Sequence, residues 1–161
     1  MKQKKYAEGT AVPVERSRAE IERLLTQHAA VQFYSGWERE NAYIGFKMQN
    51  RFVKFVLPLP VATDKAFTHH SRIGHRRTTE AAQQAYEAEV RRRWRALLLA
   101  IKAKLEVVES GIATFDEEFL AHIVLPDQKT IADYIVHQLD RIYARGGGLQ
   151  LAETSTVKGE P

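Results

Sequence analysis

The sequence predicts an α+β fold: a three-stranded antiparallel meander packed by an N-terminal helix, one long central helix and shorter C-terminal helices. Three observations favour it. Apolar residues alternate with period two in three successive runs, short polar turns join these runs, and a 3.6-residue apolar period follows from residue 79 to 110. Short turns leave no room for crossover helices, which argues against a parallel sheet.

The domain organisation follows from the same patterns. We expect a flexible basic arm over residues 1–12, one α+β domain over 13–145 and a flexible tail over 146–161. The first helix should begin after Pro13 and end near His28. Period-two runs then predict strands over 31–37, 42–48 and 52–57, and Pro58 ends the meander because proline cannot donate to a strand ladder. Residues 61–78 show no period and are predicted to form a mobile basic loop.

The long helix should begin at Thr78 or Thr79, whose hydroxyl can cap it, and end at Gly111. Its main apolar stripe consists of Tyr86, Val90, Trp94, Leu97, Leu98, Ile101, Leu105 and Val108. A second strip, Ala96, Leu99 and Ala103, predicts a contact with the C-terminal helix or with a second copy in a homodimer. Thr114 and Glu117 have capping-box spacing. A last helix is predicted from Thr130 to about Ala144, and the residues expected on its inward side are Ile131, Tyr134, Ile135, Leu139 and Ile142.

Composition narrows the class of protein. The chain has 161 residues and a net charge of +4. It contains no cysteine, which excludes disulfides and cysteine-ligated metals. No apolar stretch approaches the roughly 20 residues that a membrane-spanning helix needs, and no signal peptide is expected at the N-terminus. We therefore expect a cytoplasmic location and no membrane partner.

One face of the predicted sheet combines aromatic and basic residues: Tyr34, Tyr43, Lys47, Phe52 and Lys54. Gly36 and Gly45 on the same face should leave open backbone. Aromatic rings can stack on bases while ammonium groups meet phosphates, so the face is typical of single-stranded nucleic-acid binding. The alternative is an ordinary amphipathic strand face, partly covered by the N-terminal arm or the tail.

Basic residues form a second candidate surface: Arg72, Arg76, Arg77, Arg91, Arg95 and Lys102. At about 100° per residue, the last three fall on one stripe of the long helix, where they could follow a phosphate backbone. The alternative is a solvated helix face neutralised in part by Glu87, Glu106 and Glu109.

Two further clusters suggest metal chemistry less directly. His69, His70 and His75 could bind a divalent metal, although a solvated histidine-rich loop explains them as well. Carboxylates around Gly111 could hold Mg²⁺, namely Glu106, Glu109, Asp116, Glu117 and Glu118, but negative charge is favourable in a first helical turn in any case. No phosphate-binding loop, nucleophile elbow or metalloprotease motif occurs. We predict no catalytic residue, metal or cofactor.

Several segments together resemble small uncharacterised proteins encoded by phages and prophages. They are Val14 to Leu25, Leu57 to Pro60, Arg93-Trp94-Arg95-Ala96-Leu97, Ile101 to Glu106, Glu109-Ser110-Gly111, Phe115, Glu118 to Ala121 and Leu125-Pro126-Asp127. The resemblance covers most of residues 10–140 and transfers no active site. It implies an accessory role, either handling nucleic acid or blocking a host or defence component.

The sequence thus gives two main functional hypotheses, and an enzyme with a metal shared by Glu109 and Asp116 ranks third. The first is a non-enzymatic protein that binds nucleic acid through the aromatic and lysine residues of the sheet and an arginine-rich helix. The second is a protein-interaction module or an inhibitor of a host or anti-phage defence component, because exposed aromatic and arginine side chains often anchor interfaces.

Overall fold

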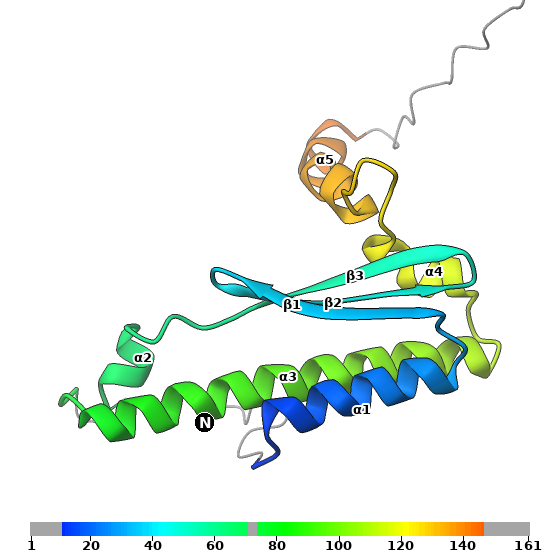
Figure 1. Ribbon diagram of the computed structural model, residues 1–161. Helices are drawn as coiled ribbons and strands as arrows, with labels where there is room; N and C mark the ends of the chain where they lie inside the picture. Colours follow the sequence, from blue (N-terminus) through cyan, green and yellow to red (C-terminus); the bar gives the residue numbers. More distant parts are fainter. Residues whose placement is uncertain (1–10, 71–73, 147–161) are drawn as a thin grey trace, which may run out of the picture.

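A computed structural model describes residues 11–70 and 74–146. Within them the chain forms the predicted α+β fold, with a three-stranded antiparallel sheet lying over two helices (Figure 1). The elements are α1 (Val14–Gln27), β1 (Gln32–Glu38), β2 (Asn41–Met48), β3 (Arg51–Pro58), α2 (Lys65–Thr68), α3 (Thr79–Glu109), α4 (Phe115–Phe119), the 3-10 turn η1 (Leu120–His122) and α5 (Ile131–Arg145).

The sheet is a meander in the order β1-β2-β3. Its register pairs Tyr34 with Gly45 and Gly45 with Lys54 across the three strands. Two-residue turns join the strands, and positive φ angles at Arg39, Gln49 and Asn50 give them the twist that tight hairpins need. Because the turns fix the register, they also decide which residues share a face of the sheet.

The core lies between the sheet and the two long helices. Ile44, Phe46, Val53 and Phe55 point from the sheet toward Trp94, Leu98 and Ile101 of α3 and Ile21 and Leu25 of α1, and all are buried. Each such side chain contributes about 1.5–3 kcal/mol when it leaves water. The predicted apolar stripe of the long helix is therefore confirmed over its central part. In its second strip, Leu99 lies beside Leu24 of α1, whereas Ala103 is exposed.

The ends of the helices follow the predicted caps. The Thr78 hydroxyl accepts a hydrogen bond from the Ala81 amide at the start of α3, and Gly111 takes a positive φ of 72° just after its end. Thr114 and Glu117 form the expected capping box of α4. No helix among the described residues is long and apolar enough to cross a membrane.

The C-terminal part is fixed to the outer edge of β3. Phe115 and Phe119 of α4 are buried in the core, and the chain then leaves η1 along the sheet edge. Ile123 forms an antiparallel bridge with Val53, and the Val124 amide donates to the Phe52 carbonyl at 2.7 Å. This short pairing covers the start of the β3 edge and places residues 124–128 beside the outer face of the sheet.

Two expectations are wrong. The segment 61–78 was predicted to lack regular structure, but it contains α2, whose Phe67 is buried against Tyr86 of α3 with ring centroids 5.9 Å apart. Five apolar residues of α5 were predicted to lie inward. Ile131 does pack, partly buried, against the core, but Tyr134 and Leu139 are 40% and 42% exposed. The helix period was read correctly, but it does not reveal whether an apolar face has a partner.

Candidate ligand-binding face of the sheet

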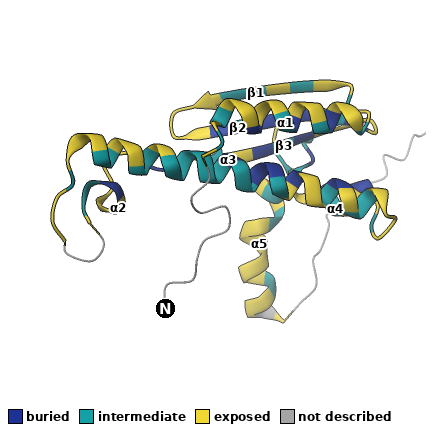
Figure 2. Cartoon of the chain, turned by 90° about the horizontal axis from the view of Figure 1, so that it is seen from below, coloured by how far each residue is buried: buried dark blue, intermediate teal, exposed yellow. Residues whose placement is uncertain are grey.

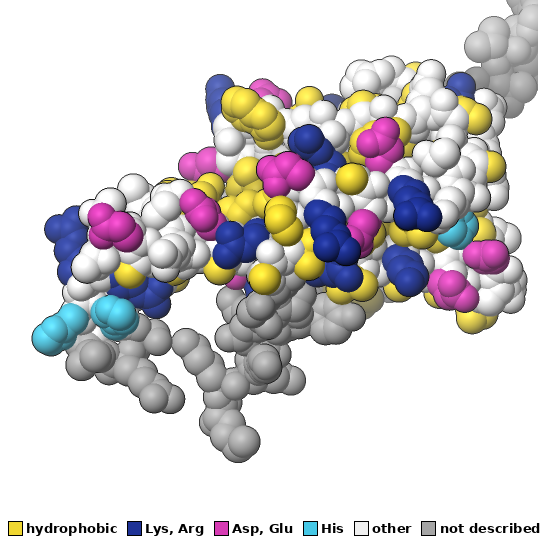
Figure 3. Space-filling model, turned by 60° about the horizontal axis from the view of Figure 1, so that its bottom comes forward, with side chains coloured by type: hydrophobic (Ala, Val, Ile, Leu, Met, Phe, Trp, Pro, Cys, Tyr) yellow, Lys and Arg dark blue, Asp and Glu magenta, His cyan; other side chains and the backbone are white. Residues whose placement is uncertain are grey.

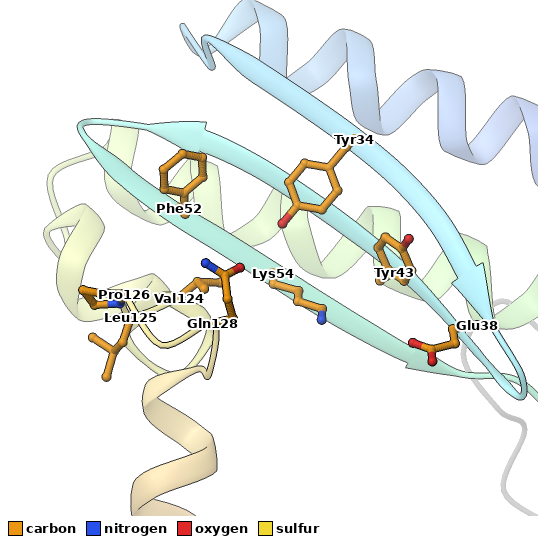
Figure 4. A pocket seen from close by; sticks show the side chains of 9 residues that line it. All are labelled: Tyr34, Glu38, Tyr43, Phe52, Lys54, Val124, Leu125, Pro126 and Gln128. Carbon is orange, nitrogen blue, oxygen red and sulfur yellow. The ribbon is translucent and has the colours of Figure 1, made fainter.

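The outer face of the sheet, opposite α1 and α3, brings together all five of its predicted site residues. Gln32, Tyr34, Gly36 and Glu38 of β1 share this face with Asn41, Tyr43, Gly45 and Lys47 of β2 and with Phe52, Lys54 and Val56 of β3. Tyr34 and Phe52 are each 42% exposed. α5 lies on this side of the sheet (Figure 1), but it stands beyond the β3 edge and no described helix crosses the rings (Figure 4).

The two tyrosines lie across glycines of the neighbouring strand. A Cβ atom built on Gly45 would lie 1.8 Å from Cζ of Tyr34, and one built on Gly36 would lie 2.3 Å from Oη of Tyr43. The expectation of open backbone at these glycines is therefore wrong, because the rings fill that space. Aromatic cover of strand glycines also stabilises the register. One face of each tyrosine ring packs against the sheet.

Two lysines flank the rings. The Lys47 ammonium lies 5.1 Å from the ring centroid of Phe52, and that of Lys54 lies 5.5 Å from the ring centroid of Tyr43. These are cation–π distances, and they hold the positive charges near the aromatic surface. An anionic ligand lying on the rings would therefore meet both ammonium groups.

A hollow of about 750 Å³ opens over this face (Figure 4). Its floor consists of Tyr34, Tyr43, Phe52 and Lys54, with Glu38 at one end. Its wall consists of Val124, Leu125, Pro126 and Gln128 from the segment that follows η1. The sequence pattern did not reveal this wall, although the apolar run Ile123-Val124-Leu125 before Pro126 was a signal for a strand-like pairing.

His122 holds the wall against the sheet. Its ring stacks on Phe55 with centroids 4.0 Å apart, and it is half-buried. Burial, followed by the nearby positive charge of Lys104, lowers the pKa of His122 below its usual value of about 6.5, against a hydrogen bond with the Lys54 backbone that raises it. The neutral imidazole is thus the form that fits the fold.

We expect the folded state to lose stability as the pH falls from about 6.5, because the unfolded chain binds a proton at His122 before the folded chain does. The loss of stability should grow until the pH falls below the pKa of His122 in the folded protein. Urea unfolding over a pH series should show it, and His122→Gln should flatten this part of the profile. His137→Gln, at an exposed position of α5, is the control. An unchanged slope in His122→Gln would contradict the assignment.

The arginine stripe of α3 does not join the aromatic face. Arg95 donates to Glu20 of α1 at 2.7 Å, and Arg91 lies 3.7 Å from Glu87. The contact with Arg95 is the largest cause of the lowered pKa of Glu20. These arginines and Lys102 line hollows between α1 and α3, on the opposite side of the sheet from Tyr34. Figure 3 shows basic and acidic side chains interspersed on this side.

The remaining basic residues lie in a third place. Arg76 and Arg77 line a small hollow of about 230 Å³ with Thr79 and Gln83, at the start of α3. Arg72 lies outside the described residues. The predicted basic set is thus divided between two regions, neither of which meets the outer face of the sheet.

The acidic and histidine clusters are also separated. Asp116 pairs with Arg51 at 2.9 Å, Glu118 with Lys104 at 2.9 Å, and Glu109 lies 3.1 Å from His28. Backbone and side-chain hydrogen bonds from Thr114 lower the pKa of Glu117. In the ranges 11–70 and 74–146, no three histidine or carboxylate side chains converge as a metal site would require.

The small-residue strip of α3 is not one open surface. Ala96 and Leu99 are half-buried, and Leu99 lines a hollow with Leu24 of α1, whereas Ala103 is exposed. A homodimer through this strip therefore stays a prediction that the fold does not favour.

These features define an α+β protein whose sheet is open on one face and carries rings and ammonium groups there. No protein-family model, curated protein or solved structure matches the chain. The resemblance to phage-encoded proteins therefore stays a prediction.

Proposed function

We propose that this chain is a non-enzymatic protein that binds single-stranded nucleic acid across the outer face of its sheet. The observation that carries the proposal is the position of Tyr34 and Tyr43 across Gly45 and Gly36. One side of each ring rests on the sheet, so the ring needs no further ordering before a base stacks on it.

Ring and charge positions support the proposal further. Tyr34, Tyr43 and Phe52 come from three different strands, so successive bases could meet successive rings across the sheet. Stacking contributes about 1–3 kcal/mol per base without reading sequence. Lys47 and Lys54 beside these rings would supply the phosphate contacts, which assigns the electrostatic part of binding to two residues.

The number of available cations sets the expected salt dependence. Since the arginines of α3 are paired with glutamates on the other side of the sheet, we expect about two phosphate contacts. The logarithm of the association constant should then fall with the logarithm of salt with a slope near about −1.4 for a single strand. A track along the arginine stripe would give a steeper slope.

Fluorescence anisotropy with labelled single-stranded oligonucleotides, over a series of salt concentrations, tests the proposal. Lys47→Gln and Lys54→Gln should each weaken binding severalfold and reduce the salt slope by about 0.7. Lys102→Gln is the matched control, because it removes the same charge from the exposed side of α3. No binding by micromolar protein at low salt would overturn the proposal, as would an equal loss in the Lys102 variant.

One observation favours a second function, as a protein-interaction module. The apolar face of α5 leaves Val136, Leu139 and Tyr143 exposed, which is typical of a helix that docks on a partner. The resemblance to phage-encoded proteins makes a host or defence component the expected class of partner. Capture of one specific protein from nuclease-treated lysate, lost on Leu139→Asp, would favour this function over the first.

A further inference from the structure

Strand β1 forms an open edge of the sheet. It runs along the margin of the molecule with no described element beyond it (Figure 2). The opposite edge, on β3, is covered near its start, where Ile123 bridges Val53 and the Val124 amide donates to the Phe52 carbonyl. The β3 edge is therefore partly paired with another segment, whereas no described segment pairs with the β1 edge.

The hydrogen-bond alternation identifies the free groups of β1. The Leu59 amide donates to the Glu40 carbonyl, so the even-numbered residues of β2 bond to β3 and the odd-numbered ones bond to β1. Through the register, the even-numbered residues of β1 bond to β2. The amides and carbonyls of Phe33, Ser35 and Trp37 therefore point outward, away from the sheet.

Within the part of the chain that the structure describes, this edge lacks most of the usual protection against pairing, and its one charged residue, Glu38, stands at its end. The strand Gln32–Glu38 contains no lysine and no proline. Trp37 is 76% exposed, and Val31, just before the strand, is 73% exposed. Apolar side chains stand at both ends of a row of backbone groups that no other described strand pairs with, and an added strand would cover both.

We propose that a second copy of this chain adds to the β1 edge, strand against strand and antiparallel, about a two-fold axis at Ser35. The two sheets then form one sheet of six strands. Because Ser35 is the middle residue of the strand, the pairing matches every position of β1 with one on the second copy. The outward groups of Phe33, Ser35 and Trp37 find partners in this register.

The paired side chains are complementary. Phe33 lies opposite Trp37 of the second copy, on the helix side of the sheet, so each exposed indole is covered by a phenyl ring. The Gln32 amide lies opposite the Glu38 carboxylate of the second copy and can donate to it. The sequence of the strand, Gln-Phe-Tyr-Ser-Gly-Trp-Glu, is thus self-complementary when reversed about its centre.

Cysteine crosslinking tests both the pairing and its register, and the natural chain contains no cysteine to interfere. Under mild oxidation Ser35→Cys should crosslink to itself, since the paired Cα atoms lie about 5.5 Å apart. Gln32→Cys alone should not, because its two copies lie about 20 Å apart along the strands. A mixture of Gln32→Cys and Glu38→Cys proteins should give the mixed dimer only. Equal crosslinking by all variants would overturn the register.

Light scattering gives an independent measurement on the natural chain, which we expect to be a dimer. Ser35→Pro removes an outward amide and leaves the β1–β2 ladder intact, so it should weaken the dimer about tenfold or more. Ser35→Ala keeps that amide and should remain dimeric. Circular dichroism of both variants separates lost pairing from lost folding. A natural chain that stays monomeric at its highest soluble concentration would overturn the proposal, whatever else binds the edge.

Discussion

Replacing Phe119 by alanine should lower the free energy of unfolding by about 3–5 kcal/mol, the largest effect we expect from one core substitution. Phe119 is fully buried. It lies edge-on to Phe46 and Phe55 of the sheet, with ring centroids 5.9 and 6.2 Å away, and stacks on Phe115 at 4.6 Å. The substitution would leave a cavity where α4 meets the sheet.

Urea unfolding measures this effect, and Leu120→Ala is the matched control. Leu120 is the next residue, also apolar, but 48% exposed. Its loss should cost less than about 1 kcal/mol. A similar loss in both variants would contradict the view that α4 is held by its aromatic contacts. The wall of the outer-face hollow follows α4 in the chain. Phe119→Ala should therefore also lower the affinity for any ligand that contacts this wall.

The largest effect on ligand binding should come from removing two rings of the outer face. The double variant Tyr34→Ala/Phe52→Ala should weaken oligonucleotide binding at least about thirtyfold, since each lost stacking contact costs about 1 kcal/mol or more. Both side chains are well exposed, so most of the core is untouched. Anisotropy titration at constant salt measures the change.

Two further variants show whether the ring positions matter. Tyr34→Phe keeps the ring over Gly45 and should bind as the natural chain does. Gly45→Val keeps Tyr34 in the sequence but places a Cβ atom where its ring now lies. The ring is the far end of an exposed side chain, so it should move off the sheet and binding should fall while the fold persists. Natural affinity in Gly45→Val would show that the flat ring position is not needed.

The elements of the fold could be predicted because each depends on local information. Period-two alternation, the tight turns and the Thr78 and Thr114 caps were each visible within a few residues. The pairing of Arg95 with Glu20 was not visible, because 75 residues separate them and only the packing of α1 on α3 brings them together. Long-range ion pairs decide which basic side chains remain available to bind a phosphate. The basic stripe read from the sequence therefore predicted a larger binding site than the structure supports.

The face of the sheet was predicted and its detailed surface was not. Alternation correctly placed Tyr34, Tyr43 and Phe52 on one side. That the tyrosines would cover Gly45 and Gly36 depends on the cross-strand register, which the turn residues fix only once the hairpin closes. The missing partner of α5 had no signal at all, since a buried and an unpartnered amphipathic helix share the same pattern.

Helix α3 is longer than the sheet that it packs against. Thirty-one helical residues extend about 46 Å, whereas an eight-residue strand extends about 26 Å. The helix therefore projects past the sheet on the side of α2 (Figure 1). The overhanging turns pack on α2, where the ring centroids of Phe67 and Tyr86 lie 5.9 Å apart. The buried residues of α3 begin at Trp94, so the packing of its first turns depends on α2 and not on the sheet.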